Sequence, residues 1–373
     1  MSNGELGRDI SKLGFGLMRL PMIGDKIDME QVEKMVDHFM EAGFTYFDTA
    51  YVYHSGQSEV VAREAIVKRY PRNTFQLATK MPVWEAKKYE DYQRLFDIQL
   101  ERTGAGYFDF YLLHALNLDS ANEVDQLGAW DFVKDMKEKG FIKHIGFSFH
   151  DKAQSLDEIL TKHPEAEFVQ LQINYVDWED AEVQSRECYE VARKHNKPII
   201  IMEPIKGGSL AVMRPEVQEI FKKVNPDLSI ASWAMRFAAS LEGVITVLSG
   251  MSNISQVEDN ISYMSDVKPL SEEEKITIKK AVEEIAKIPT IPCTSCKYCV
   301  DGCPQKINIP GAFYSLNNYK QYQNLDASKG NYNWVTSGAG KASDCISCGA
   351  CESHCPQHIS IIDTLKEVAS VLE

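Results

Sequence analysis

Two groups of residues in this sequence have types and spacings suited to chemistry. The first is a pair of cysteine runs, "CTSCKYCVDGCP" at 293–304 and "CISCGACESHCP" at 345–356. The second is a set of four polar residues, Asp48, Tyr53, Lys80 and His114, each at or just after the end of a short apolar run. Thiolates bind metals, whereas a tyrosine beside an ammonium and an imidazole can exchange a proton with an oxygen atom. The sequence therefore predicts a metal site and an acid–base site.

Cysteine usage is uneven along the chain. Eight of the nine cysteines lie at or beyond residue 293, and the ninth, Cys188, reads as a small buried residue on a helix. A secreted domain built on disulfides would have a similar density. The first sixteen residues, however, lack the charged start and apolar run of a secretory signal, so we expect a cytoplasmic protein whose cysteines bind metal.

Both cysteine runs fit the pattern C-x2-C-x2-C-x3-C-P, which is the spacing of bacterial ferredoxins with two clusters. In this pattern the fourth cysteine of each run binds the cluster of the other run. One 4Fe–4S cluster is therefore expected on Cys293, Cys296, Cys299 and Cys355. The second is expected on Cys345, Cys348, Cys351 and Cys303. Paired C-x2-C units also bind zinc, but two runs of four that each close on Cys-Pro disfavour that alternative.

The composition is that of an ordinary globular protein with an acidic balance. The chain has 373 residues, and 54 Asp and Glu against 40 Lys and Arg give a formal net charge of −14. This sign disfavours nucleic acid as a partner, and there is no basic run to contradict it. No apolar stretch approaches the roughly 18 residues of a membrane span. The sequence does not indicate an oligomeric state.

From residue 10 to about 265, short apolar runs alternate with longer amphipathic stretches. Eight strands are predicted: "LGFGLM", "TYFDTA", "FQLATK", "FDFYLLH", "IKHIGFS", "FVQLQIN", "PIIIMEP" and "GVITVLSG". The helices predicted between and after them are Glu30–Ala42, Ser58–Tyr70, Tyr89–Thr103, Glu123–Lys139, Ala153–Lys162, Asp180–His195, Ile230–Ala239 and Ile254–Met264. Eight strand-then-helix units over about 250 residues predict a (β/α)8 barrel. A doubly wound sheet is the alternative, but no G-x-G-x-x-G turn follows the first strand.

A second, smaller domain is expected to follow the barrel. The stretch "LSEEEKITIKKAVEEIAK" is predicted to be a helix with Ser271 as its N-cap and Glu274 completing a capping box. Pro289 then ends it, so the predicted domains are the barrel at 1–288 and a ferredoxin-like α+β or helical iron–sulfur domain at 289–373. The stretch "NLDASKGNYNWVTSGAGKASD" is predicted to be a loop, and "CPQHISIIDTL" a strand and a helix.

In a barrel the catalytic groups come from the carboxyl ends of the strands, where Asp48, Lys80 and His114 fall, with Tyr53 in the following loop. A tyrosine has an ordinary pKa of about 10, and a neighbouring ammonium favours the phenolate. Lys80 is therefore expected to lower the pKa of Tyr53 and make it a general acid. Asp48 would hold Lys80, and His114 would orient a carbonyl oxygen.

The segments "FDTAYVYHSGQSE", "LATK" and "YLLH" resemble the catalytic segments of the aldo-keto reductase superfamily, over roughly residues 10–265. The resemblance implies that Asp48, Tyr53, Lys80 and His114 are catalytic and that NAD(P)H is the cofactor. It also implies cofactor contacts, which fall on Ser148, Gln172, Met202, Gly207, Gly208, Ser209, Gly250, Ser252, Gln256, Asp259 and Asn260.

The cofactor segments depart from the family at several points. Met202 stands where the family has an aromatic residue against the nicotinamide, which leaves room for a bound flavin. Met251, Ser252 and Gln256 supply no positive charge where relatives that prefer NADPH have Lys or Arg. The choice among NADH, NADPH and flavin is therefore left open.

The whole chain resembles the iron–sulfur-containing aldo-keto reductases of bacteria and archaea. Hydride transfer moves two electrons together, whereas each cluster passes one, and a flavin could bridge the two. The sequence thus predicts an oxidoreductase that acts on a small carbonyl or alcohol and exchanges electrons with a ferredoxin or flavodoxin-like carrier. The alternatives are an NAD(P)H-dependent reductase whose clusters are structural, and a non-catalytic electron-transfer or redox-sensing protein.

Overall fold

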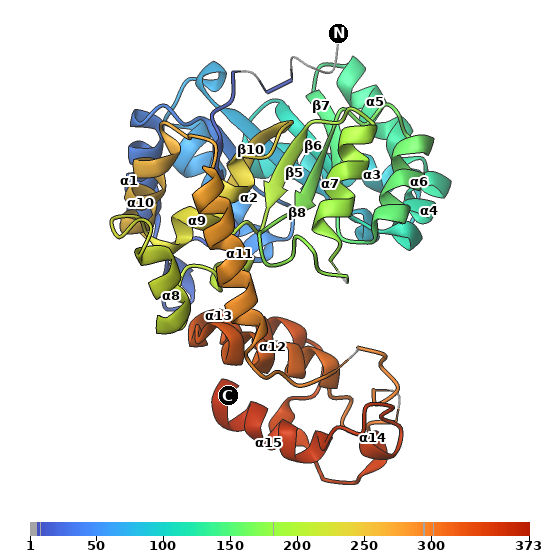
Figure 1. Ribbon diagram of the computed structural model, residues 1–373. Helices are drawn as coiled ribbons and strands as arrows, with labels where there is room; N and C mark the ends of the chain where they lie inside the picture. Colours follow the sequence, from blue (N-terminus) through green and yellow to red (C-terminus); the bar gives the residue numbers. More distant parts are fainter. Residues whose placement is uncertain (1–5, 8, 182, 294, 301) are drawn as a thin grey trace. The chain divides into compact units, whose positions relative to one another are not determined.

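The computed structural model describes residues 6–7, 9–181, 183–293, 295–300 and 302–373. The chain divides into two compact units (Figure 1). The first contains residues 1–204 and 234–270, and the second contains residues 205–233 and 271–373. The segment after the seventh barrel strand thus belongs to the same unit as the C-terminal helices. The predicted domain boundary at residue 289 stays a prediction.

The first unit is built on a closed barrel of eight parallel strands, in the order β1-β10-β9-β8-β7-β6-β5-β4. The strands are β1 (Leu13–Gly16), β4 (Tyr46–Asp48), β5 (Gln76–Met81), β6 (Phe108–Leu116), β7 (Ile142–Phe149), β8 (Phe168–Gln172), β9 (Ile199–Met202) and β10 (Val244–Ser249). Strands β2 (Met22–Ile23) and β3 (Lys26–Ile27) form a separate antiparallel pair. The predicted (β/α)8 barrel is confirmed, and the doubly wound alternative is excluded because β1 pairs with β10.

The helices between and after the barrel strands lie where the sequence predicts them, except at three places. These helices are α1 (Met29–Glu41), α2 (Gln57–Ala62), α3 (Tyr89–Thr103), α4 (Leu118–Leu127), α5 (Ala129–Glu138), α6 (Ala153–Lys162), α7 (Ser185–Lys194), α9 (Ile230–Ala239) and α10 (Ile254–Met264). The predicted helix 123–139 is two helices, because Gly128 has a φ of +77° and breaks it. The predicted helix 58–70 becomes a π-turn after residue 62, and the one from 180 begins only at 185.

The strand periodicity sets which side chains reach the interior of the barrel. A central cluster contains, among others, Tyr46, Ala78, Phe110 and Phe168. Side chains two residues apart on a strand point to the same face. Asp48 lies two residues after Tyr46, and Lys80 lies two residues after Ala78. Both side chains therefore project inward, at the carboxyl end of the barrel.

The second unit is helical in its described residues (Figure 1). Its longer helices are α8 (Pro215–Lys222), α11 (Glu272–Ala286), α12 (Ile309–Tyr322), α13 (Leu325–Val335) and α15 (Ile361–Leu372), with the short α14 (Ala350–Ser353). The predicted capping box is confirmed, since Ser271 Oγ accepts from the Glu274 amide at 3.2 Å and Glu274 Oε2 accepts from the Ser271 amide at 2.9 Å.

Two expectations for the second unit are wrong. The stretch predicted as a loop contains α13, whose first turn is capped by Asn324 Oδ1 accepting from the Ala327 amide at 3.0 Å. The stretch "CPQHISIIDTL", predicted to be a strand and a helix, contains no strand, and its helix α15 begins at Ile361. In the described part of the chain, no helix is both long enough and apolar enough to cross a membrane.

Candidate active site and cluster-binding cysteines

Three of the four predicted catalytic residues lie at the ends of adjacent strands. Asp48 ends β4, Lys80 is next to last in β5, and His114 lies near the end of β6. These strands pair in register, with Asp48 opposite Ala78 and Lys80 opposite Leu112. The fourth residue, Tyr53, begins a short 3-10 turn that follows β4. The strand ends therefore fix three of the groups, and a loop supplies the tyrosine.

The ammonium of Lys80 is the centre of the site. Its Nζ donates to Asp48 Oδ1 at 2.5 Å, to the Thr49 carbonyl at 2.8 Å and to Tyr53 Oη at 3.4 Å. Lys80 and Asp48 are 1% and 3% exposed. Gln170 Nε2 donates to the second oxygen of Asp48 at 3.1 Å. The carboxylate is thus held on both oxygens, and the ammonium points to the tyrosine hydroxyl.

The pKa shifts of the site have identifiable causes. Burial alone would lower the pKa of Lys80, but Asp48 and Tyr53 raise it above its usual value, so the ammonium stays charged. Burial raises the pKa of Tyr53, and Lys80 only partly offsets this effect. The expectation that Lys80 would bring the pKa of Tyr53 below its usual value is therefore not met. Tyr53 is protonated at neutral pH, which is the form that a proton donor requires.

His114 completes the group. Its ring centroid lies 6.0 Å from that of Tyr53 in an edge-to-face arrangement and 5.2 Å from that of Trp84. Burial, followed by Lys80 and His150, lowers the pKa of His114 well below its usual value. In the described residues its buried Nδ1 has no hydrogen-bond partner. A neutral imidazole beside a tyrosine hydroxyl can hydrogen-bond a carbonyl oxygen.

A buried polar network that the sequence reasoning missed supports Lys80 and the tyrosine loop. Glu59, which is fully buried, accepts from Thr79 Oγ1 at 2.7 Å, from Gln99 Nε2 at 2.8 Å and from Arg102 Nη1 at 3.3 Å. Gln99 Nε2 also contacts the Lys80 carbonyl at 3.0 Å, and Arg102 Nη1 donates to the carbonyl of Tyr51 at 3.2 Å. The sequence signal that could have indicated this network was the polar pair Ser58 and Glu59 in the first turn of α2.

Four of the non-glycine residues with a positive φ lie next to the site. His54, Ser55, Ala115 and Glu203 all have a positive φ, between 48° and 55°. They follow Tyr53, His114 and Met202 in the chain. Residues other than glycine adopt this conformation at a cost of order 1–3 kcal/mol, and such residues cluster at functional sites. His54 and Ser55 lie in the turn that begins at Tyr53, Glu203 follows the end of β9, and Ala115 lies within β6 where its register with β7 shifts.

The predicted nicotinamide residues lie at the same end of the barrel. Gln172 and Met202 are opposite each other in the register of β8 and β9. Ser148 is buried, and its Oγ accepts from the Ala115 amide at 2.8 Å, so it also holds the backbone of β6 just after His114.

The predicted adenosine residues follow β10. Gln256 Oε1 accepts from the Ser252 amide at 2.7 Å. Asn260 is buried, and its Nδ2 donates to Ser249 Oγ at 2.7 Å, so its amide holds the loop together. Asp259 lies one residue before it on α10, and Gly250 begins the loop.

The predicted pyrophosphate residues Gly207, Gly208 and Ser209 belong to the second unit. Gly207 and Gly208 close a 3-10 turn, with φ of 64° and 99°. The carbonyl of Gly208 accepts from Asn324 Nδ2, the N-cap of α13, at 2.9 Å.

The eight clustered cysteines line two cavities in the second unit. One cavity is lined by Cys293, Cys296, Cys299 and Cys355, and the other by Cys303, Cys345, Cys348 and Cys351. Each set combines three cysteines of one run with the last cysteine of the other, as the spacing predicts. In the described part of the chain, no three acidic, histidine or cysteine side chains are grouped closely enough for a single metal ion. Four thiols around each cavity are the ligand set of one 4Fe–4S cluster.

The fold and these sites define an oxidoreductase-type barrel joined to an iron–sulfur domain, and comparison with known families agrees. The model of the aldo/keto reductase family matches residues 12–283, and that of the 4Fe-4S dicluster domain matches residues 292–360. This protein therefore belongs to the aldo/keto reductase family, whose members are oxidoreductases.

Curated relatives match mainly the barrel. The uncharacterized oxidoreductase YqkF of Bacillus subtilis is 24% identical over 71% of this chain and 90% of its own length. The L-galactose dehydrogenase of Arabidopsis thaliana is 21% identical over 78% of this chain and 95% of its own length. The probable aldo-keto reductase 1 of Glycine max is 29% identical over 47% of this chain and 51% of its own length.

Solved structures show the same barrel. The holo form of an aldo-keto reductase from Bacillus halodurans aligns with a TM-score of 0.58 and 23% identity, over 73% of this chain and 92% of that chain. An aldo-keto reductase from Klebsiella pneumoniae, solved in complex with NADPH, aligns with a TM-score of 0.58 and 19% identity, over 73% and 90%.

Proposed function

We propose that this protein reduces the carbonyl group of a small molecule, or oxidises the corresponding alcohol, with Tyr53 as general acid or base. The observation that carries the proposal is the position of Lys80 Nζ, 2.5 Å from Asp48 Oδ1 and 3.4 Å from Tyr53 Oη. Asp48 keeps the ammonium charged and in place. The ammonium then stabilises the phenolate that remains after Tyr53 gives its proton to the carbonyl oxygen.

The other residues of the site suit the same reaction. His114 is neutral and offers a hydrogen bond to the carbonyl oxygen, which orients the substrate. Ser148, Gln172 and Met202 lie at the carboxyl end of the barrel, and we expect the nicotinamide of NAD(P)H to bind against them. The NADPH complex of the Klebsiella pneumoniae relative supports this cofactor. A bound nicotinamide dinucleotide would supply the hydride. The role of a flavin and a cytoplasmic location both stay predictions.

The cysteine cavities support two 4Fe–4S clusters, which would supply one-electron transfer. In each set one cysteine is exposed, Cys296 in one and Cys348 in the other. Clusters with an exposed ligand lie close enough to the surface to exchange electrons with an external carrier such as a ferredoxin or a flavodoxin-like protein.

A second candidate function keeps the carbonyl chemistry and makes the clusters structural. It is favoured by one observation: Cys299 and Cys351 are part of the hydrophobic core of the second unit, which also includes Phe313, Leu316 and Leu365. Replacing Cys296 by Ala separates the two candidates. Turnover lost in a protein that still unfolds cooperatively supports electron transfer, whereas unfolding of the second unit supports the structural role.

The central experiment compares Tyr53→Phe with the unchanged protein after anaerobic purification, with the iron content measured for both. We expect a fall in carbonyl reduction of about 10²–10⁴-fold, the range for loss of a general acid, with the same iron content. Unchanged turnover would contradict the proposal. Electron flow through the clusters without any carbonyl reduction in either protein would favour the electron-transfer or redox-sensing alternative.

A further inference from the structure

The two cysteine runs of the second unit repeat the same backbone conformation. Each run has a serine between its first two cysteines, and Ser295 and Ser347 both have a φ of 55°. Three residues after the fourth cysteine, Lys306 and His358 have φ of 52° and 51°. Their amides donate to the carbonyl of the fourth cysteine of the same run, at 3.0 and 3.1 Å. Because the two backbones match, a difference between the two cavities has to come from the side chains.

The position after the second cysteine differs between the two runs. The first run has Lys297 there and the second has Gly349, and both have a positive φ, of 64° and 79°. Glycine adopts this conformation readily, whereas a lysine adopts it at a cost in stability. The first run therefore carries a lysine at a position where its own repeat shows that glycine suits the backbone.

Lys297 places a positive charge at one of the two cavities. We call the cavity that contains Cys293 the first cavity and the one that contains Cys345 the second cavity. Lys297 is exposed and lines the first cavity. Among the described residues that line either cavity, no other is charged, and Lys306 lines neither. The charge that distinguishes the two cavities is therefore that of Lys297.

The second run differs from the first by a charge of the opposite sign. Glu352 follows its third cysteine, where the first run has Val300. The Oε1 of Glu352 accepts from the amide of Ile362 at 2.9 Å, and Ile362 lines the second cavity. Within the first run, the charges of Lys297 and Asp301 balance, whereas Glu352 leaves the second run negative when histidine is neutral. The runs thus differ in the direction that favours an added electron at the first cavity.

We propose that Lys297 gives the cluster of the first cavity the higher reduction potential, so that a single electron on the domain settles there. A nearby positive charge stabilises the reduced form of a cluster, because reduction adds one negative charge. In the transfer, the cluster of the second cavity is oxidised by one electron and that of the first is reduced by one, with no change in bonds or protons. An external one-electron carrier supplies the electron. The inference rests on the proposed function, because it assumes that both cavities bind 4Fe–4S clusters.

The test is a redox titration of the anaerobic holoprotein, with dithionite as the reductant and EPR of the reduced clusters as the readout. The proteins are the unchanged chain, Lys297→Gln, Gly349→Lys and the control Lys279→Gln. Lys279 is exposed on α11, which lines neither cavity, so its replacement changes the net charge equally. We expect Lys297→Gln to lower the higher of the two potentials alone. The electron distribution between the clusters should then change about tenfold, which is about 59 mV for one electron.

The reverse change tests the same charge at the other cavity. Gly349→Lys should raise the lower potential alone, and a Cβ at Gly349 has nothing within 4 Å. Iron content shows whether each variant holds its clusters, and the result for Lys297→Gln decides if Gly349→Lys does not. Equal potentials in the unchanged protein, unchanged potentials in Lys297→Gln, a shift of the lower potential instead, or an equal shift in Lys279→Gln would overturn the inference and leave the proposed function standing. An unchanged protein that binds no iron would overturn both the inference and the clusters of the proposed function.

Discussion

The barrel carries an Asp–Lys–Tyr group at each end, and the distances within the two groups are nearly alike. At the carboxyl ends of the strands, Lys80 Nζ lies 2.5 Å from Asp48 Oδ1 and 3.4 Å from Tyr53 Oη. Its ammonium is 4.9 Å from the centre of the tyrosine ring. We call these three residues the site group.

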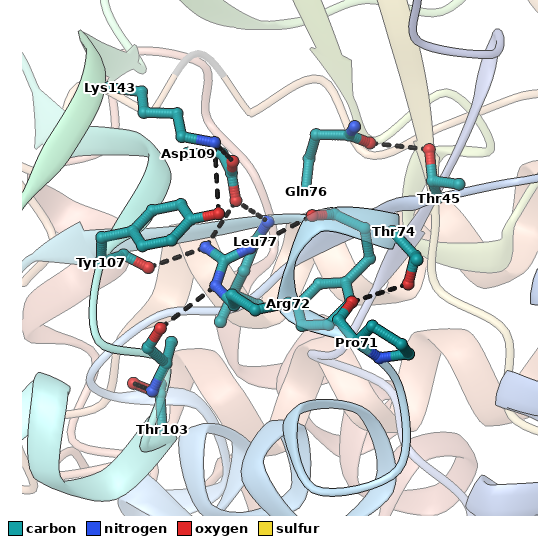
Figure 2. Close-up of polar contacts among 12 residues, drawn as sticks. Thr45, Pro71, Arg72, Thr74, Gln76, Leu77, Thr103, Tyr107, Asp109 and Lys143 are labelled. Carbon is teal, nitrogen blue, oxygen red and sulfur yellow. Dashed lines mark hydrogen bonds and ion pairs between the residues drawn. The ribbon is translucent and has the colours of Figure 1, made fainter.

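The basal group, Asp109, Lys143 and Tyr107, lies where β6 and β7 begin (Figure 2). Lys143 Nζ lies 2.8 Å from Asp109 Oδ1, 3.3 Å from Tyr107 Oη and 4.3 Å from the centre of its ring. Residue types and distances alone therefore do not distinguish a catalytic group from a structural one.

The two groups differ in burial and in what else their atoms contact. The Lys143 side chain is 50% exposed, against 1% for Lys80. Asp109 Oδ2 also accepts from Arg72 Nη2 at 2.6 Å and from the Leu77 amide at 2.9 Å (Figure 2). Arg72 in turn donates to three backbone carbonyls. The basal group ties strand starts together, whereas the site group has a protonated hydroxyl beside the neutral ring of His114.

The largest effect is expected from replacing the two lysines. Lys80→Met should lower kcat/KM about 10²–10⁴-fold, because Tyr53 loses the cation that stabilises its phenolate. It should also lower the free energy of unfolding by about 3–5 kcal/mol, since Asp48 stays buried without a counter-charge. Steady-state kinetics and urea unfolding measure the two quantities.

Lys143→Met is the matched control at the other end. Because its side chain is half exposed, we expect unchanged kcat/KM and a stability loss of at most about 1 kcal/mol. Equal losses of activity in the two variants would mean that the site group has no special role.

The reverse pattern is expected for Asp109→Asn. Asp109 is 4% exposed and binds two cations and an amide, so its neutralisation should cost about 3 kcal/mol of unfolding free energy. The value of kcat should not change. Asp131→Asn, on an exposed pair with Lys134, is the control and should leave the unfolding midpoint where it is. A fall in kcat for Asp109→Asn without a fall in stability would contradict the structural role.

A smaller effect is expected from the turn that carries Tyr53. Gly56 has a φ of +88°, and a Cβ there would lie 2.8 Å from the guanidinium carbon of Arg102. Gly56→Ala should cost about 1–3 kcal/mol of unfolding free energy and reduce kcat several-fold, because the turn that begins at Tyr53 must shift. Gly140→Ala, with a φ of +82° and nothing within 4 Å, should cost stability alone.

The smallest effect is expected from pH. Carbonyl reduction needs protonated Tyr53, whose pKa lies above its usual value, so kcat/KM should be flat from about pH 6.5 to 9 and fall only above about pH 10. His114 should add no acidic limb near pH 6.5, because burial keeps it neutral there. Alcohol oxidation should instead rise as the phenolate forms. A fall in carbonyl reduction centred near pH 7 would show that another group supplies the proton.

The comparison of the two groups also shows which features could be predicted from the sequence and which could not. The barrel could be predicted from the alternation of apolar runs and amphipathic stretches. That Asp48, Lys80 and His114 lie at or near the ends of adjacent strands could be predicted as well, while their catalytic role stays a prediction. The cysteine spacing predicted which four would meet in each cavity. The basal group was missed because a polar residue at the start of a strand carries no distinct signal, although it repeats the same residue types.

Other features depended on contacts between segments far apart in the chain. The helix α13 contains Gly330 and several Asn and Ser residues of low helix propensity, so packing against α12 and the Asn324 cap decide its structure. The pKa of Tyr53 was predicted with the wrong sign, because the sequence did not show how deeply its hydroxyl is buried.

The most direct test of the site group is a double-mutant cycle on kcat/KM with Tyr53→Phe, Lys80→Met and both together. If Lys80 acts through the hydroxyl of Tyr53, the double variant should be about as slow as the slower single variant, because residues that act as a unit are not additive. If the fold-losses in kcat/KM of the two single variants multiply in the double variant, Lys80 does not act through Tyr53, and this result would contradict the proposed role of the site group.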